Sequence, residues 1–402
     1  MVITGNNVTE ARGRFNQKVM DSKKIILGIL PSLGGSIESQ RNDRREGLFL
    51  DYYVAKYAER FDVIYYFSYG DQTTELQRSA TKQFTIFPNR RRWHRYVYQF
   101  LLPFLNCETI RKCSVIRVMQ ANGIIPAILA KWRFKIPFIV TYGYDYAAFA
   151  KIEGHWLKTL MLRCLLPFFL RDADGIIVTT EESKRWIEKH VGISDKIQLV
   201  PNGVDVAWFS QVHERNASRS FQLLFVGRLE RQKNLFFLMD MIAILCQKTE
   251  VEVTLIGDGS LRNDLEIYAK ERNLPVKFLG SIPYADIKNY HAKANCFLMP
   301  SLTEGHPKAL IEAMSSGLAC VVSNCSGNNA LVKHNQTGLL LELGSAEMWA
   351  DAVFDLLKNP KKRQALGLSA RNQIVEEFDI HKTLAQEIDL LEKAAMQKQK
   401  IQ

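Results

Sequence analysis

The chain has 402 residues, a formal net charge of +11, 47% hydrophobic residues and 24% charged residues. These proportions are ordinary for globular proteins and exclude a disordered chain, a fibrous repeat and a disulfide-stapled miniature fold. The length exceeds what one hydrophobic core usually serves, so we expect two domains of roughly 150–200 residues each.

Short runs of β-branched and aromatic residues alternate with longer helical patterns along the chain. The first series predicts strands at 24–30, 62–67, 84–87, 114–119, 137–141 and 175–179, with helices at 48–60 and 181–190. Polar residues and weak periodicity mark a break at 202–220. The second series predicts strands at 221–226, 251–256, 276–279, 296–299 and 318–323, and helices at 235–247, 261–272, 309–316 and 348–357. Residues 386–402 indicate one more helix.

This alternation favours an α/β fold, in which helices cover both faces of parallel sheets. Two series separated by a break indicate two Rossmann-like, doubly wound domains. The predicted division is a polar extension at 1–22, a first domain at 23–200, a linker at 201–220, a second domain at 221–378 and a C-terminal helix at 379–402 that packs back on the first domain. In such an arrangement, ligands bind beyond the carboxyl ends of the strands, in the cleft between the domains.

The seven cysteines include no C-x-x-C pair, and most lie in apolar runs. We interpret them as reduced core residues of a cytoplasmic protein rather than metal ligands. The first twenty residues lack the apolar core of a signal peptide. No apolar run reaches about 18 residues, so no membrane-spanning helix is expected. The longest candidate, 156–170, is interrupted by Lys158, Arg163 and Pro167.

Positive charge gathers in two places. The clusters are Arg41, Arg44 and Arg45, and then Arg90, Arg91, Arg92 and Arg95. The second cluster runs into aromatic residues and leucines, so the segment 90–105 suits a helix lying on an anionic membrane surface. It equally suits an amphipathic core helix with a solvated basic side, and both interpretations stay open. Nucleic acid is not an expected partner, because no RNP, KH or zinc-finger signature occurs.

Glycines and cations follow predicted strands. Gly34 and Gly35 come after the first strand and either let a ligand approach the backbone or simply form a turn. Gly227, Arg228 and Lys233 come after the strand at 221–226. A helix start favours anions, Arg228 can contact two phosphate oxygens, and Lys233 supplies a compact charge. This pair suits a diphosphate, whereas we interpret the nearby Arg231 as a solvated loop charge.

The densest segment contains two glutamates, Glu304 and Glu312, with seven residues between them. Glu312 falls inside an apolar helical pattern, and a carboxylate there needs hydroxyl or cationic partners. Sugars and ribose supply such hydroxyls. The amides of the opening turn can bind a phosphate, although Pro307 removes one donor. Taken singly, Glu304 could be a helix-start acid and Glu312 a surface residue. That interpretation explains poorly why both glutamates occur together in this segment.

Five motifs in order resemble the large family 4 of retaining glycosyltransferases, which have the GT-B architecture. They are the segment Pro-Asn-Gly-Val-Asp at 201–205 with Phe209, Gly-Arg-Leu at 227–229 with Lys233 and Asn234, Gly-Asp-Gly at 257–259, Phe-Leu-Gly at 278–280, and the E-x7-E motif from Glu304 to Glu312. Five motifs at suitable spacing are more specific than any one, and they extend over most of the chain.

The resemblance implies transfer of a hexosyl or related sugar from a UDP- or GDP-linked donor to a glycan, lipid-linked or polysaccharide acceptor, without a cofactor or a divalent metal. Arg228 and Lys233 would hold the diphosphate, Glu304 would contact the donor sugar, and Glu312 would bind the ribose. The other implied donor contacts are Gly34, Gly35, Gly227, Gly257, Gly280, Gly305, His306, Lys308 and Ala309. The cysteines indicate the cytoplasm, and the basic and aromatic segment 90–105 leaves open a peripheral contact with the inner face of the membrane.

The sequence departs from the family pattern at two places. The family often has His-Gly-x-Asp after a strand of the first domain, where this chain has Tyr142 in the histidine position and Asp145 in the aspartate position. Both are expected on the acceptor or sugar side, although a tyrosine is a poorer base. His306 and Pro307 replace the commoner Phe-Gly. Two alternatives remain: a GT-B sugar-nucleotide epimerase, and a nucleotide-sugar-binding protein without catalytic activity.

Overall fold

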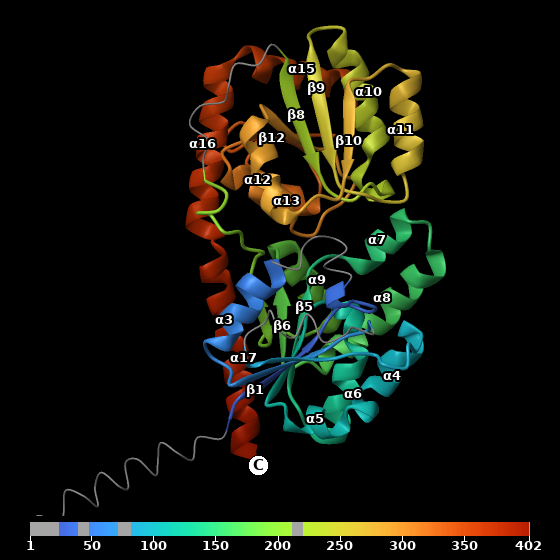
Figure 1. The fold of residues 1–402 in the computed structure, drawn as a ribbon, viewed down its shortest axis with the longest axis vertical. Helices are drawn as coiled ribbons and strands as arrows, with labels where there is room; N and C mark the ends of the chain where they lie inside the picture. The colour runs from blue at the N-terminus through green and yellow to red at the C-terminus, as the bar shows by residue number, and fades with distance from the viewer. Residues whose placement is uncertain (1–23, 39–47, 71–81, 211–219, 402) are drawn as a thin grey trace, which may run out of the picture.

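The structure is a computed structural model that describes residues 24–38, 48–70, 82–210 and 220–401 (Figure 1). The predicted extension at 1–22, the cluster of Arg41, Arg44 and Arg45, and linker residues 211–219 lie outside the described residues. The rest forms two α/β domains, one above the other in Figure 1, each built on one parallel sheet.

The N-terminal sheet has the strand order β3-β2-β1-β4-β5-β6-β7 within the described residues, and all neighbouring strands are parallel. The strands are β1 (Ile26–Leu30), β2 (Val63–Phe67), β3 (Phe84–Phe87), β4 (Val115–Val118), β5 (Phe138–Tyr142), β6 (Gly175–Val178) and β7 (Ile197–Leu199). The helices are η1 (Leu48–Val54), α3 (Ala55–Ala58), α4 (Arg95–Leu105), α5 (Cys107–Lys112), η3 (Ala121–Gly123), α6 (Ile125–Phe134), α7 (Tyr146–Ile152), α8 (Trp156–Arg171) and α9 (Glu181–Val191).

Alternate strand residues of this sheet enter different hydrophobic clusters, as the pleat of a strand requires. Phe138 and Val140 of β5 pack in one cluster with α4, α6, α8 and α9. Ile139 packs in another with η1, α3 and the C-terminal helix. Helices therefore cover both faces, and the buried strands are mostly apolar, which explains why their sequences predict a parallel sheet.

The C-terminal sheet has the order β10-β9-β8-β11-β12-β13 and is parallel as well. Its strands are β8 (Phe221–Val226), β9 (Val251–Ile256), β10 (Val276–Gly280), β11 (Cys296–Met299), β12 (Ala319–Ser323) and β13 (Leu339–Leu341). Its helices are η4 (Arg231–Lys233), α10 (Leu235–Cys246), α11 (Arg262–Glu271), α12 (Tyr284–Lys293), α13 (Lys308–Ser315), α14 (Ser326–Asn329), α15 (Ala346–Lys358) and α16 (Pro360–Glu377).

The chain crosses between the domains at two places that lie side by side. The first crossing, at Val204, leads from the N-terminal to the C-terminal domain, and the second, at 378–380, leads back. The Val204 backbone amide donates to Phe378 O at 2.9 Å, and the Ile380 backbone amide donates to Val204 O at 2.9 Å. The last helix, α17 (Ile380–Ile401), then runs down the N-terminal domain and contacts β4, β5 and β6 (red in Figure 1). Arg117 of β4 and Glu387 of α17 join the two elements through a buried ion pair.

The predicted α/β class, with two parallel doubly wound sheets, is confirmed. The sequence analysis named no element at the short strands β7 and β13 or, among the helices of six or more residues, at α5, α6, α7, α12 and α16. The interpretation of cysteines as core residues is right for Cys113, Cys296 and Cys320 and wrong for Cys164 and Cys246, which are exposed on the surfaces of α8 and α10. None of the helices in the described residues is both long and apolar enough to cross a bilayer.

Candidate functional site

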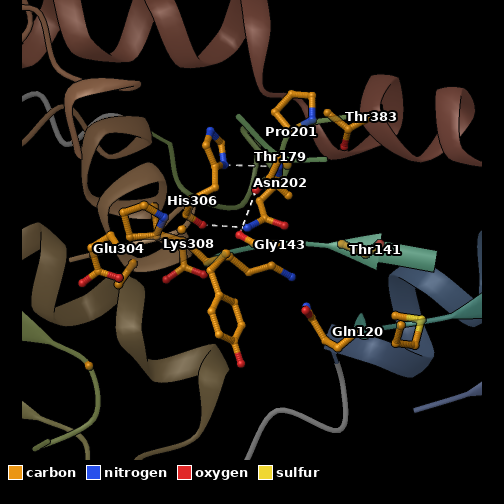
Figure 2. Close-up of a pocket in the computed structure, with 18 of the residues that line it drawn as sticks. Gln120, Thr141, Gly143, Thr179, Pro201, Asn202, Glu304, His306, Lys308 and Thr383 are labelled. Atoms are coloured by element: carbon orange, nitrogen blue, oxygen red, sulfur yellow. Dashed lines mark hydrogen bonds between the residues drawn. The ribbon is translucent and has the colours of Figure 1, made fainter. Parts of the chain in front are cut away.

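A cavity of about 550 Å³ lies between the two domains, at the carboxyl ends of strands from both sheets (Figure 2). Gly143 follows β5 and Thr179 follows β6, whereas Gly227 and Arg228 follow β8. In doubly wound sheets this edge is where ligands bind, because the loops there can vary without disturbing the sheet.

The cavity brings together most of the residues that the sequence singled out. Its lining includes Gly227, Arg228, Lys233, Glu304, Gly305, His306, Lys308, Ala309 and Glu312. They come from the loop after β8, the loop after β11 and the first turns of α13. Separate loops of the C-terminal domain therefore converge on one wall of the cleft.

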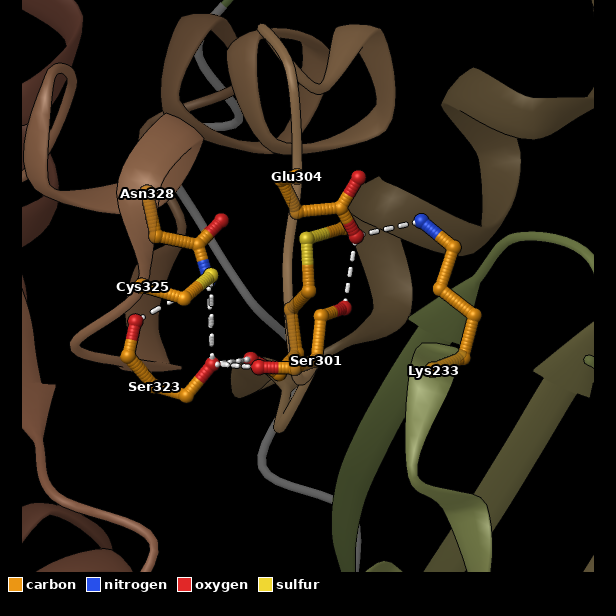
Figure 3. A network of polar contacts seen from close by, with 7 residues as sticks. Lys233, Ser301, Glu304, Ser323, Cys325 and Asn328 are labelled. Carbon is orange, nitrogen blue, oxygen red and sulfur yellow. Dashed lines mark hydrogen bonds and ion pairs between the residues drawn. The ribbon is translucent and has the colours of Figure 1, made fainter. Parts of the chain in front are cut away.

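Glu304 is held by a network of polar contacts (Figure 3). Its Oε1 accepts from Lys233 Nζ at 2.5 Å and from Ser301 Oγ at 2.6 Å. The side chains of Lys233 and Glu304 are 10% and 7% exposed, so the ion pair is nearly removed from water. Ser323 Oγ in turn donates to Ser301 O at 2.5 Å. Buried charges need such partners, and the network fixes the carboxylate at the cavity wall.

Arg228 lies in a different environment. It is exposed at the cavity, and in the described part of the chain its guanidinium has no carboxylate partner. The positive charge of Arg228 acts on the hydroxyl of Tyr144 in the other domain. Burial raises the pKa of this hydroxyl, and the charge of Arg228 reduces the rise. Of the two cations that follow β8 in the cavity lining, Lys233 is therefore already neutralised, whereas Arg228 is available to an anion.

Glu312 lies one turn into α13, a helix that begins directly after Pro307. Its side chain is largely buried, and Oε1 accepts from the Tyr284 hydroxyl at 3.0 Å. Burial and the neighbouring carboxylate both raise the pKa of Tyr284, so the hydroxyl stays a proton donor. This carboxylate thus lines the cavity with one hydroxyl partner already in place, which shows that the site accepts hydroxyl donors.

His306 ties the interdomain segment to the loop before α13. The backbone amide of Asn202 donates to His306 Nδ1 at 3.2 Å, and the side-chain Nδ2 of Asn202 donates to His306 O at 2.6 Å (Figure 2). Burial, aided by Lys308, lowers the pKa of the imidazole to about 3. The ring is therefore neutral, and because Nδ1 accepts, the proton sits on Nε2. Lys308 itself crosses the cleft and donates to the Tyr53 hydroxyl at 3.1 Å.

Four predicted glycines lie outside the cavity lining. Gly34 and Gly35 form a turn beside Arg95. Gly257 and Gly280 shape the loops behind Gly227: the Gly257 amide donates to Gly280 O at 2.9 Å. Gly257 has φ +129°, and a Cβ there would lie 1.9 Å from Gly227 O. The structure thus places Gly257 and Gly280 behind the loop at 227–233, which they support, rather than at the cavity surface.

Tyr142 and Asp145 also lie outside the lining. Tyr142 is buried and stacks on Trp186 with ring centroids 5.1 Å apart. Asp145 begins α7, where its Oδ1 accepts from the amides of Ala147 and Ala148 at 2.9 and 3.0 Å. This is a helix N-cap. The cavity surface that was expected from these two residues comes instead from Gly143 and Tyr144 between them.

The sequence analysis missed cavity residues on the N-terminal domain and on α17. Arg117 and Glu387 both line the cavity, and their Nε and Oε1 atoms lie 2.8 Å apart. Tyr57 donates to the same carboxylate. Burial raises the pKa of Glu387, but the attraction of Arg117 and the hydrogen bonds from Arg117 and Tyr57 together outweigh burial, so the net pKa is lowered. An arginine inside the apolar strand at 115–118 was the available signal, because an isolated charge in a buried strand needs a partner.

A second cavity of about 340 Å³ adjoins the first. It lies between α7, α8 and the loops of the C-terminal domain, and both cavities share Tyr144, Phe149, Arg228 and Gln232. Its remaining lining includes Lys158 of α8 and Glu230. Arg228 therefore stands where the two cavities meet. Within the described ranges, no three His, Cys, Asp or Glu side chains gather as metal ligands would.

Both domains match known protein families. Residues 208–373 match the family model described as Glycosyl transferases group 1, and residues 50–208 match Glycosyltransferase Family 4. A galactosyltransferase of Escherichia coli, named for UDP-Gal and alpha-D-GlcNAc-diphosphoundecaprenol, is 30% identical over 254 residues, 60% of this chain and 63% of its own. The amylovoran biosynthesis glycosyltransferase AmsK of Erwinia amylovora is 32% identical over 53% of this chain and 55% of its own. The chain thus spans less than two thirds of these two relatives.

Solved structures share the fold over nearly the whole chain. Sucrose-phosphate synthase of Thermosynechococcus elongatus has a TM-score of 0.75 at 19% identity, covering 92% of this chain and 98% of its own. Anabaena HepE in complex with UDP-glucose has a TM-score of 0.73 at 19% identity, covering 92% and 100%. The expected GT-B architecture is confirmed. With the two family models, these findings support a glycosyltransferase of the family 4 type.

Proposed function

We propose that this protein is a retaining glycosyltransferase that moves a hexosyl or related sugar from a nucleoside-diphosphate sugar to a glycan or lipid-linked acceptor, in polysaccharide biosynthesis. The observation that carries the proposal is that one interdomain cavity is lined by Arg228, Lys233, Glu304 and Glu312 together. HepE binds UDP and UDP-glucose, and the E. coli relative is named for UDP-Gal, so a UDP-linked donor has more support than a GDP-linked one.

The proposed donor lies along the wall of the C-terminal domain. The available Arg228 and the neighbouring Lys233 contact the diphosphate, Glu304 contacts the sugar, and Glu312 with Tyr284 contacts the ribose. The neutral His306 can donate its Nε2 hydrogen to a sugar oxygen. We propose that the two cations do the work of a divalent metal at the diphosphate. Fixed positive groups are most effective there because negative charge develops on the leaving diphosphate in the transition state.

In the proposed reaction, the bond from the anomeric carbon to the diphosphate oxygen breaks, and a bond from the same carbon to an acceptor oxygen forms. The acceptor attacks from the face that the diphosphate leaves, and the acceptor proton passes to the departing oxygen. Retention therefore needs no protein nucleophile. The two domains enclose the reacting groups and limit access of water, which would otherwise hydrolyse the donor.

We place the acceptor in the second cavity, because it meets the donor cavity at Arg228 and Tyr144. The relative that is named for a diphosphoundecaprenol-linked sugar supports an acceptor with a phosphorylated lipid anchor. Lys158, which lines the second cavity, supplies a cation for such an acceptor. An acceptor in this position would approach the donor sugar from the N-terminal domain.

The test is conversion of a panel of UDP- and GDP-linked sugars in the presence of membrane extract, read by product mass. We expect a glycosylated lipid or glycan from one donor. The double variant Arg228→Ala and Lys233→Ala should abolish turnover, whereas the exposed Arg231→Ala should not. Conversion of the donor to its epimer without acceptor would assign an epimerase instead. Donor binding without any product across the panel would assign a binding protein.

A further inference from the structure

Two helices of the N-terminal domain expose large apolar side chains that no part of the described chain covers. On and beside α4 these are Trp93, Tyr96, Val97, Phe100, Phe104 and Leu105, and on α8 they are Trp156, Leu157, Leu160, Met161, Leu165 and Phe168. Trp156 is 71% exposed and Phe168 is 57% exposed. These twelve side chains are more than half of the large exposed apolar side chains in the described residues, so the exposure is concentrated rather than scattered.

The two helices cover the same face of the N-terminal sheet. Tyr98 and Leu102 of α4 and Leu166 and Leu170 of α8 are buried in one hydrophobic cluster. Both helices are seen at the same side of the N-terminal domain in Figure 1. Each helix thus has one side in the core, and its opposite side is apolar as well as exposed. An ordinary surface helix is polar on that side.

The exposed side of α8 has the pattern of a helix that lies in a membrane interface. At about 100° per residue, the exposed apolar residues fall within an arc of about 180°, from Trp156 to Leu165. Lys158 falls just beyond one edge of this arc and Arg163 just beyond the other. Basic side chains in these positions can extend to lipid headgroups while the apolar arc enters the acyl boundary.

The charge around this surface is of one sign. No Asp or Glu occurs from residue 82 to residue 107 or from residue 154 to residue 171. The same stretches contain Arg90, Arg91 and Arg92 before α4, Arg95 at its first position, and Lys158, Arg163 and Arg171 in α8. A second copy of this chain would place these cations against one another, whereas an anionic bilayer complements them.

We propose that the exposed apolar surface of α4 and α8 docks on an anionic lipid bilayer. Apolar side chains enter the interface, and the flanking cations contact acidic headgroups. The sequence pointed only to the segment 90–105, and the structure adds α8 as the second half of the surface. Since Lys158 and Leu162 of α8 also line the second cavity, docking would bring that cavity close to the lipid surface. The proposal concerns the partner of this surface and does not depend on the proposed transfer.

The test is flotation of the full-length protein with vesicles of phosphatidylcholine alone and with about 30% phosphatidylglycerol. We expect flotation with the anionic vesicles at low salt and weaker flotation at high salt. Failure of the wild type to float with anionic vesicles at low salt overturns the proposal. Because flotation needs no turnover, this result is independent of whether the protein is a glycosyltransferase.

Variants assign the binding to the two helices. The triple variant Leu157→Ser, Leu160→Ser and Met161→Ser, and separately Phe100→Ser with Phe104→Ser, should each lower the bound fraction by about tenfold. The matched control replaces exposed apolar residues of the C-terminal domain: Ile267→Ser, Leu368→Ser and Val375→Ser. It should float like the wild type. Equal loss in the control overturns the proposal, and a triple variant that floats like the wild type overturns the role of α8.

Charge reversal separates headgroup contact from apolar insertion. Arg91→Glu with Arg163→Glu should abolish flotation with anionic vesicles, whereas the exposed pair Lys270→Glu and Lys361→Glu should not. Light scattering after size-exclusion chromatography tests whether a second copy of this chain, rather than a bilayer, covers the surface. A wild type that is dimeric without lipid, and monomeric in the triple variant, would assign the surface to self-association and overturn the proposal. All variants change exposed residues, and a thermal transition like that of the wild type verifies their fold.

Discussion

The Lys233 ammonium and the Glu304 carboxylate neutralise each other inside the interdomain cavity, at 2.5 Å from Nζ to Oε1. Their loops follow different strands, β8 and β11, which are neighbours in the sheet. The pairing means that either residue positions the other. A substitution at Lys233 or Glu304 therefore has to preserve the shape of the side chain. Only then does its effect report the chemical role of the residue separately from its structural role.

Glu304→Gln preserves this shape and removes the charge. The amide oxygen can still accept from Ser301 and Lys233, so we expect folding to persist. If Glu304 acts on the donor sugar, kcat should fall by about 10²-fold, while donor affinity changes only a few-fold. Steady-state kinetics and calorimetric titration of the donor measure the two quantities. Glu342→Gln, an exposed glutamate bonded to Asn324, serves as the control; unchanged kcat in Glu304→Gln would remove Glu304 from the mechanism.

Gly257→Ala should distort the loop that carries Gly227. The added Cβ would meet Gly227 O, and the backbone has a φ that alanine rarely adopts. We expect a loss of at least about 2 kcal/mol in the free energy of unfolding, together with weaker donor binding. Gly344→Ala is the matched control, because a Cβ there meets nothing within 4 Å. Urea unfolding of both variants measures the difference, and equal stabilities would contradict the close approach.

Below neutral pH, His306 should destabilise the folded protein. Its pKa is about 3 in the fold and about 6.5 when unfolded, so the unfolded chain binds the proton first as pH falls. The free energy of unfolding should therefore decrease between pH 6.5 and 3, by about 1.4 kcal/mol per pH unit from this residue. His306→Asn keeps an acceptor for the Asn202 amide and should flatten the dependence. Urea unfolding at pH 7, 6 and 5 compares the two proteins.

The wild type alone offers a second measurement. The imidazole resonances of His306 should stay unchanged in an NMR titration from pH 7 to 5. A midpoint near 6.5 for His306 would show that burial does not hold the ring neutral.

Glu387→Gln should be strongly destabilising. It leaves Arg117 buried without a counter-charge, and breaking a buried pair on one side costs about 3–5 kcal/mol. Glu392, like Glu387, lies on α17, and Glu392→Gln removes a partner of the exposed Arg60. This variant should be far less destabilising, because an exposed ion pair contributes little. Urea unfolding of the two variants measures the contrast. Similar small losses in both would mean that the Arg117 pair does not anchor α17.

Tyr142→Phe should leave activity within about twofold of the wild type, since the hydroxyl lies away from the cavity lining. Within the described residues, this buried hydroxyl has no hydrogen-bond partner, so removing it should preserve or slightly raise stability. Kinetics and thermal unfolding of the variant test both statements. A large drop in kcat would restore the role that the family pattern assigns to this position.

The sequence predicted which residues of the C-terminal domain converge on the cavity, because these residues follow strand ends. Arg228, Lys233, Glu304 and Glu312 come after β8 and β11, and adjacent parallel strands bring such residues to one edge. Predicting that these residues converge required only the order of strands and helices along the chain. It did not require knowledge of contacts between distant residues.

The other wall of the cavity depends on contacts that local sequence does not encode. Arg117 and Glu387 are 270 positions apart, and only the return of α17 to the first domain joins them. Tyr142 is a different case. It shares the strand parity of Phe138 and Val140, so its side chain enters the cluster under α9, and alternation along β5 indicates this without a structure.

The paired crossings at Val204 and Asp379 limit how the two lobes can move. A Cβ at Gly203 would lie 2.3 Å from Thr383 Oγ1 and 2.6 Å from Ile380 Cα, so both stretches of backbone touch at a single point. Any rotation of one domain against the other must therefore deform these two crossing segments together. Ile380, the first residue of α17, supplies one of the two hydrogen bonds at the crossing, so shortening the chain past this helix would loosen the connection between the domains.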